Sequence, residues 1–217
     1  MTRTRIGVLI SGRGSNALAL IHAAEAADYP AEIALVLSNR PDAAGLGGAV
    51  DAGIPVRAVD HGPHGRDREA HERVMDATLR EAGVEFVVLA GYMRILTPFF
   101  VRAWAGRMVN IHPSLLPAFP GLRTHRQALA MGVKLHGCSV HWVVDTVDAG
   151  PIIGQAAAPV LPGDDEDILA ARVLALEHRL LPTCVALALT GAAATAAADQ
   201  MLAVPALQAA PLAKVTK

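Results

Sequence analysis

Aromatic side chains are scarce in this chain of 217 residues, at 4%, although hydrophobic residues make up 53% of it. The core must therefore be built mainly from Ala, Val, Leu and Ile, and the hydrophobic fraction excludes a disordered chain. The formal net charge is only −1, so the sequence shows no excess of positive charge for a nucleic-acid partner. The length suits one large α/β domain or two small ones.

Cysteine occurs only twice, at Cys138 and Cys184. Their separation matches neither the ligand spacing of a zinc site nor a disulfide framework, which fits a reducing, cytoplasmic location. Long hydrophobic runs are missing too. The amino terminus leads into a strand rather than a signal segment, and residues 185–198 are mostly Ala with Thr and Gly, too weakly apolar for a membrane span.

Strands and helices alternate over the first half of the chain, which is typical of a doubly wound, mostly parallel sheet with helices on both faces. We expect one domain over residues 1–190 and an Ala-rich tail over residues 191–217. Inward-facing positions are expected at Val74, Thr78 and Leu79, and Pro182 is expected to interrupt the last helix. The predicted strands are 5–10, 32–37, 54–59, 84–90, 107–109, 136–144 and 152–160, and the main predicted helices end near 27, 52, 81, 131 and 189.

A glycine-rich turn, Gly12-Arg13-Gly14-Ser15-Asn16, separates the first strand from the first helix. It lacks the third glycine of the dinucleotide fingerprint, which weakens a nicotinamide cofactor as the ligand. Free backbone amides at the helix start, with Ser15 and Asn16 as capping side chains, would suit a phosphate group. An ordinary tight turn with a good N-cap explains the same residues equally well.

The most informative stretch is Asn110-Ile111-His112-Pro113, which follows the short apolar run 107–109. Residues two apart in a strand face the same way, so the amide of Asn110 and the imidazole of His112 point to one side. Pro113 cannot continue the sheet ladder, which places both residues at the carboxyl end of the strand. An amide can stabilise a developing oxyanion and an imidazole can move protons. A strand-end pair that merely caps a turn is the alternative.

Five segments taken in order resemble the phosphoribosylglycinamide formyltransferases, folate-dependent enzymes of purine biosynthesis. They are VLISGRGSN, VVLAGYMRIL, NIHPSLLPAFPGLRTHRQAL, HGCSVHWVVDTVDAGPII and DDEDILAARVLALEH, and they lie between residues 6 and 189. The resemblance implies a formyltransferase-like fold with a Rossmann-type first half. It also implies a ribonucleotide-binding half over residues 1–105 and a folate-binding and catalytic half over residues 106–190.

The reaction that the resemblance implies moves the formyl group of 10-formyltetrahydrofolate to the primary amine of glycinamide ribonucleotide, without metal or ATP. Asn110 matches the position that stabilises the tetrahedral oxyanion, and His112 matches the general acid/base. Asp148 matches a third catalytic position, where a carboxylate would tune His112 by favouring the protonated imidazole. A turn aspartate is the alternative for Asp148.

The same resemblance implies two groups of binding residues. Core packing, surface charges and ordinary turns are the alternatives at these positions. For the ribonucleotide, Gly14, Ser15 and Asn16 match phosphate-binding positions and Glu177 matches the carboxylate that holds the amino end. For the folate, Met93, Arg94, Ile95 and Leu96 match a segment whose backbone reads the pterin, Arg68 matches a contact to the glutamate tail, and Val144, Asp145, Thr146 and Val147 match a mobile loop that closes over the pterin.

Three rival functions share some of these residues. A hydrolase that releases formate would use the same catalytic groups, but is expected to carry a further amino-terminal domain. A tRNA formyltransferase would need a further carboxyl-terminal domain, and a non-catalytic ribonucleotide-binding protein would need no catalytic triad. His125, His136 and His141 are interpreted as spare histidines, because positions five apart on a strand face opposite sides and make a poor metal site. The expected partners are small molecules, with the chain a monomer or homodimer.

Overall fold

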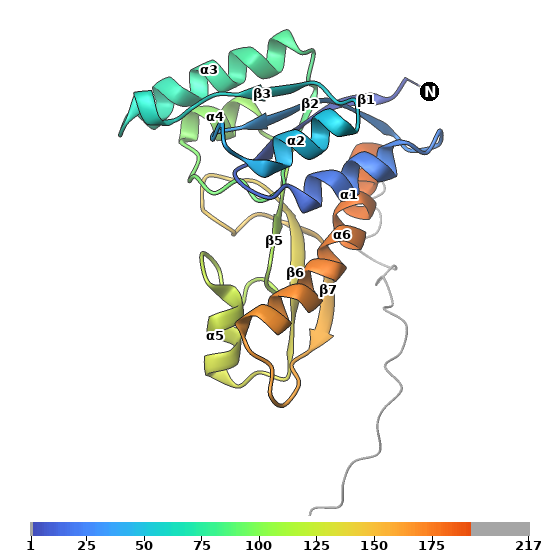
Figure 1. Ribbon diagram of the computed structural model, residues 1–217, viewed down its shortest axis with the longest axis vertical. Helices are drawn as coiled ribbons and strands as arrows, with labels where there is room; N and C mark the ends of the chain where they lie inside the picture. The colour runs from blue at the N-terminus through green and yellow to red at the C-terminus, as the bar shows by residue number, and fades with distance from the viewer. Residues whose placement is uncertain (1, 192–217) are drawn as a thin grey trace, which may run out of the picture.

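The computed structural model describes residues 2–191, which form a seven-stranded sheet in the order β3-β2-β1-β4-β5-β6-β7 (Figure 1). Neighbours from β3 through β5 pair in parallel, whereas β6 and β7 add antiparallel strands at one edge. The predicted doubly wound, mostly parallel sheet is confirmed. The strands are β1 (Thr4–Ile10), β2 (Ala31–Ser38), β3 (Val56–Ala58), β4 (Phe86–Leu89), β5 (Met108–His112), β6 (Leu135–Trp142) and β7 (Ile152–Pro159).

Helices cover both faces of this sheet (Figure 1). Alternate residues of β1 enter different cores: Val8 and Ile10 pack with α1 and α6, whereas Leu9 packs with α3 and α4. This alternation is the period of two that a strand buried on both faces requires. The helices are α1 (Ser15–Ala24), α2 (Ala44–Asp51), α3 (Arg68–Glu81), α4 (Pro98–Ala103), α5 (Thr124–Met131) and α6 (Glu166–Thr190), with a 3₁₀ turn at Gly62–His64.

The buried side of α3 agrees with the prediction at Leu79, which is fully buried, but differs from it elsewhere. Val74 is 44% exposed, and the helix faces inward through His71, Glu72, Met75 and Leu79. The inner positions recur every four residues from His71, so a polar histidine and a glutamate occupy sites that a hydrophobicity pattern leaves outside. The prediction of the inner face was wrong because it considered only the hydrophobicity of each residue.

The last helix, α6, continues through Pro182 instead of breaking there, so the predicted interruption is wrong. A proline inside a helix costs about 3 kcal/mol, but Leu169, Val173 and Leu181 are fully buried in the core beneath it. The hydroxyl of Tyr29 also donates to the Pro182 carbonyl at 2.8 Å. Packing of the apolar face on the sheet therefore outweighs the local preference of the proline.

α6 is also the one helix in residues 2–191 that is long and apolar enough to cross a membrane by length and composition. Its contacts with β6, β7 and α1 account for that composition, because its apolar side lies on the sheet. The expected tail, residues 191–217, lies outside the described residues apart from Gly191.

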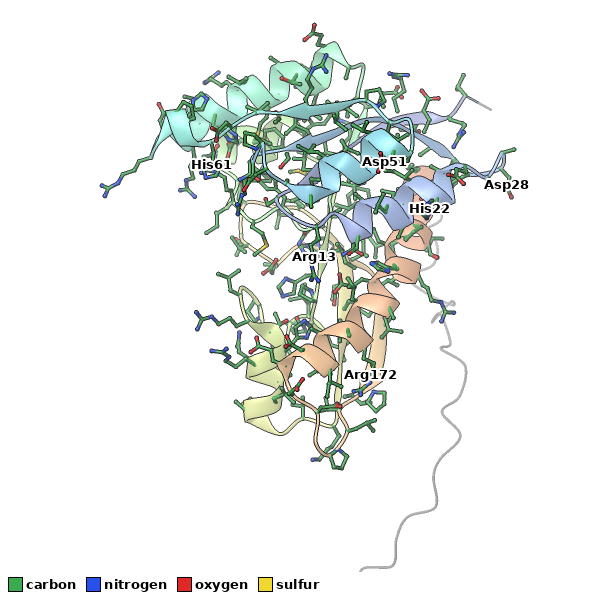
Figure 2. The ribbon with its side chains drawn as sticks, viewed as in Figure 1. Arg13, His22, Asp28, Asp51, His61 and Arg172 are labelled. Carbon is green, nitrogen blue, oxygen red and sulfur yellow. The ribbon has the colours of Figure 1, made fainter. Side chains whose placement is uncertain are left out.

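The turns that carry candidate site residues lie at the carboxyl edge of the sheet. Figure 2 shows His61 at this edge, after β3, and Asp28 at the opposite edge, before β2. The chain runs outward from β1 through β2 to β3, then crosses back to β4 on the other side of β1. In open α/β sheets ligands bind outside the carboxyl ends at such a switch point.

Candidate active site

Asn110 and His112 lie in the last three residues of β5, with β4 on one side and β6 on the other. The β5–β6 register places His141 directly opposite Asn110, so their side chains are neighbours on one face. The Asn110 amide nitrogen lies 3.2 Å from Nε2 of His141. Nδ1 of His141 lies 2.9 Å from the Trp142 carbonyl, which can only accept. His141 therefore carries its proton on Nδ1 and accepts from Asn110 on Nε2.

Among residues 2–191, this arrangement leaves one N–H of Asn110 without a partner. The other is used by His141, which fixes the direction of the amide. Burial lowers the pKa of His141, with the nearby charge of Asp148 acting in the opposite sense. A neutral His141 is the form that can accept from Asn110, so the burial and the hydrogen bond agree. Asn110 is thus held ready to donate to an oxyanion.

His112 has an oxygen beside each ring nitrogen. Nε2 lies 3.0 Å from the Phe119 carbonyl, and Nδ1 lies 3.5 Å from Oδ2 of Asp148. The two side chains are 7% and 9% exposed, so water screens the pair only weakly. An imidazolium can donate from both nitrogens, whereas a neutral ring can donate from one. His112 is therefore placed so that a proton gained by its ring meets an oxygen acceptor at either nitrogen.

Two residues with left-handed backbone conformations hold these oxygens in place. Phe119 has φ of 54° and Asp148 has φ of 53°, values that non-glycine residues rarely adopt. The backbone N–H of Gly121 donates to Oδ2 of Asp148 at 2.8 Å, so the loop that carries Phe119 also fixes the carboxylate. Backbone strain of this kind concentrates at functional sites.

His141 is the site residue that the sequence analysis missed. It was set aside as a spare histidine, yet its Nε2 lies 3.7 Å from Oδ1 of Asp148 as well as beside Asn110. Only the strand register shows that it faces Asn110, and register is set by the pairing of distant segments. His136, five residues earlier on β6, packs against the rings of His125 and Phe119 instead.

The glycine-rich turn after β1 is built differently from the prediction in one respect. The N-cap of α1 is Gly14, with φ of 72° and no side-chain cap, so Ser15 and Asn16 begin the helix and do not cap it. A Cβ on Gly14 would lie 2.6 Å from Cα of Gly45, so the turn can approach α2 only without a side chain there. The uncapped amides at the helix start remain available to an anion.

Asn16 links this turn to α6. Its amide nitrogen donates to Oε2 of Glu177 at 2.6 Å, and both side chains are buried. Burial raises the pKa of Glu177, while the Asn16 hydrogen bond and the charge of His112 act against that shift. The carboxylate is thus short of partners and suited to a cationic ligand. The structure brings Asn16 and Glu177 together.

The predicted folate residues lie on two loops. Met93 and Ile95 are 66% and 60% exposed, so they are not core residues, and Arg68 from α3 donates to the Ile95 carbonyl at 3.2 Å. Val144 and Val147 are exposed as well. Arg94, Leu96, Asp145 and Thr146 accompany them on the same two loops. Within residues 2–191, no group of three His, Cys, Asp or Glu side chains is placed to hold a metal ion.

The chain belongs to the formyl transferase family. Residues 4–185 match the model of that family. The chain is 47% identical to the phosphoribosylglycinamide formyltransferase of Escherichia coli, over 83% of this chain and 84% of that protein.

Other relatives are longer or have solved structures. The chain is 50% identical to the trifunctional purine biosynthetic protein adenosine-3 of Drosophila pseudoobscura pseudoobscura, over 88% of this chain but only 14% of that protein. It thus spans a small part of the trifunctional relatives. The crystal structure of glycinamide ribonucleotide transformylase 1 from Symbiobacterium toebii matches with a TM-score of 0.84 and 46% identity, over 87% of this chain and 89% of that one.

Proposed function

We propose that this chain transfers the formyl group of 10-formyltetrahydrofolate to the primary amine of glycinamide ribonucleotide, a step of purine biosynthesis. The observation that carries the proposal is the arrangement of Asn110, His112 and Asp148, with the amide half free and the imidazole between two oxygens. The names of the relatives point to the same reaction.

The chemistry follows from those three side chains. The amine attacks the formyl carbon and forms a tetrahedral oxyanion, which the free N–H of Asn110 stabilises. His112 accepts the proton that the amine loses and returns it to the departing folate nitrogen. Asp148 and the Phe119 carbonyl stabilise the imidazolium that exists between these two transfers. No other group needs to change its covalent bonds.

Substrate binding uses both sides of the carboxyl edge. The backbone of Gly14, Ser15 and Asn16 receives the phosphate of the ribonucleotide, and Glu177 pairs with the amino end. Arg68, Met93, Arg94, Ile95 and Leu96 bind the folate, and Val144, Asp145, Thr146 and Val147 close over its pterin. We assign ribonucleotide binding mainly to residues 1–105, and catalysis with folate closure to residues 106–190. The protein acts in the cytoplasm on small molecules, as a monomer or homodimer, without metal, ATP, nucleic acid or membrane.

Consumption of 10-formyltetrahydrofolate with and without glycinamide ribonucleotide tests the proposal. We expect consumption only when the ribonucleotide is present, because the amine is the attacking group. Equal consumption without it would identify a hydrolase, and no consumption in either case would identify a binding protein. Asn110→Ala should reduce the rate by about 100-fold or more while the ribonucleotide still binds.

A further inference from the structure

Ser11 joins the ends of three strands at the carboxyl edge of the sheet. It is the first residue after β1 and is 6% exposed. Its hydroxyl oxygen accepts from the backbone N–H of Met93, which follows β4, at 2.8 Å. The same oxygen lies 2.6 Å from Oδ1 of Asn39, which follows β2.

The direction of these bonds is determined by the groups involved. The Met93 N–H can only donate, so the Ser11 hydroxyl accepts there and gives its one proton to Asn39. Asn39 is itself 2% exposed, and Nδ1 of His61 lies 2.7 Å from its backbone carbonyl and 3.2 Å from its side-chain nitrogen. Ser11 therefore belongs to a hydrogen-bonded network that links residues after β1, β2 and β4.

The position of this chain is the switch point of the sheet, between β1 and β4. The backbone N–H of Ser11 also donates to the Gly91 carbonyl at 3.1 Å, which keeps the two strand ends side by side. Three residues after Ser11 the chain reaches Gly14 and the start of α1. Met93 begins the exposed stretch 93–96, whose other backbone contact is the Arg68 bond to Ile95.

We propose that Ser11 is a positioning residue that holds the folate-binding backbone at Met93 in register with the phosphate-binding turn at Gly14–Asn16. The inference rests on the proposed function, since it takes the two ligands from there. The Ser11 hydroxyl fixes the Met93 N–H and Asn39 together, so residues 93–96 and the turn cannot shift independently. Without the hydroxyl, the Met93 N–H loses its hydrogen-bond partner and the folate-binding backbone is free to move.

A purely structural serine is the competing explanation, and the chain offers a matched control for it. Ser38 ends β2, the neighbouring strand, and is fully buried. Its hydroxyl accepts from the Arg40 backbone N–H, at 3.0 Å, within its own loop. Ser38→Ala removes the same chemical group at the same edge of the sheet without touching residues 93–96.

The experiment measures binding of tetrahydrofolate, which has no formyl group to transfer, and of glycinamide ribonucleotide by calorimetry. Each ligand is titrated alone and with the other saturating, for the wild type, Ser11→Ala, Ser11→Cys and Ser38→Ala. We expect both Ser11 variants to bind tetrahydrofolate about 5- to 10-fold more weakly, the range for one lost hydrogen bond to a buried group. Ribonucleotide bound alone should change by less than about twofold, and its effect on tetrahydrofolate affinity should shrink.

Three results would overturn the inference. They are equal weakening of both ligands in Ser11→Ala, the same loss in Ser38→Ala, and wild-type binding by Ser11→Cys, which fills the same space with a poor acceptor. Failure of the proposed function is seen separately, in the wild type: it would bind the ligands without consuming 10-formyltetrahydrofolate when the amine is present. A wild type that transfers formyl while Ser11→Ala behaves like Ser38→Ala refutes only the role of Ser11.

Discussion

At the scale of single residues, the account depends on how His112 and Asp148 act together. The imidazole meets an oxygen on each side, from Phe119 and from Asp148. Because both side chains are almost fully buried, His112 and Asp148 attract each other more strongly than the same groups would on the surface. The proposed mechanism therefore assigns proton transfer to the pair and not to either side chain alone.

Replacement of His112 or Asp148 by Ala should therefore reduce kcat by about 100-fold or more. Because the two act on one proton, the double variant should lose little beyond the worse single variant. Steady-state rates at saturating substrates give the comparison, and calorimetric binding of the ribonucleotide shows that each variant is folded. Losses that add fully in log rate would mean that the two residues act independently.

Glu177 should show a conflict between stability and binding. Burial raises its pKa, so the folded state binds a proton more readily than the unfolded state, and stability falls as pH rises through that interval. Glu177→Gln can still accept from Asn16 and removes the buried charge. We expect a higher Tm near neutral pH, a gain that disappears below about pH 4, and a ribonucleotide KM raised about 10-fold or more.

The exposed Glu32, which pairs with Arg5 at the far edge, provides the control. Glu32→Gln should leave the ribonucleotide KM unchanged, because it removes a carboxylate at the opposite edge of the sheet from the site. A Glu177→Gln protein that is less stable at neutral pH would show that the carboxylate has partners that compensate its burial.

Single residues also show how much of the candidate site could be predicted from the sequence. The period of two in a strand was enough to place Asn110 and His112 on one face, and the structure agrees. His141 could not be found that way, because it meets Asn110 only through the β5–β6 register. The bond between Asn16 and Glu177 joins residues 161 positions apart, and no local pattern contains it.

At the scale of elements, α2 makes a close approach to the glycine-rich turn after β1. A Cβ on Gly45 would lie 2.7 Å from Cα of Gly14 and 2.8 Å from Cδ1 of Ile10. The N–H of Gly45 also donates to the Gly12 carbonyl at 3.0 Å. The turn therefore depends on a second glycine, located in another element.

Gly45→Ala should displace the turn, lower the Tm and raise the KM for the ribonucleotide more than that for the folate. Gly47, two residues along the same helix, would place its Cβ in open space. Gly47→Ala should stabilise the protein by about 0.5–1 kcal/mol through helix propensity, without changing either KM. Thermal denaturation and steady-state kinetics of the two variants, measured side by side, test this prediction. If Gly45→Ala behaves like Gly47→Ala, the close approach of α2 to the turn has no role in ribonucleotide binding.

Elements were predicted well where a pattern is local, and wrongly where tertiary packing competes with it. The apolar runs gave all seven strands. The inner face of α3 was misplaced because His71 and Glu72 are buried, with Nε2 of His71 beside the Val59 carbonyl at 2.8 Å and Glu72 accepting from Thr97. Such partners lie outside the helix, so its own sequence does not reveal them.

At the scale of the whole molecule, buried histidines dominate the response to acid. Burial lowers the pKa of His136 to about 4, so the folded protein keeps this ring neutral while the unfolded chain takes up a proton below about pH 6.5. Stability is therefore lost as pH falls from about 6.5 toward 4. Burial lowers the pKa of four further histidines in the same direction: His71, His125, His141 and His178.

Two buried glutamates act in the opposite sense. The pKa values of Glu72 and Glu177 are raised by burial, so their protonation on acidification favours the folded state. The histidines begin to titrate at higher pH and outnumber them. We expect the Tm to fall between about pH 7 and 5, and the fall to be smaller in His136→Phe. His22→Gln, at an exposed position of α1 (Figure 2), should keep the wild-type slope; an unchanged slope in His136→Phe would contradict this origin.

The central claim is that the formyl group leaves the folate for an amine and not for water. The most direct measurement follows an isotopically labelled formyl group of 10-formyltetrahydrofolate by NMR, with the wild-type protein and glycinamide ribonucleotide present. The account predicts that the label appears in the formylated ribonucleotide, in step with loss of the donor, and that His112→Ala abolishes this signal. Label that appears instead as free formate, at the same rate with and without the ribonucleotide, would contradict it.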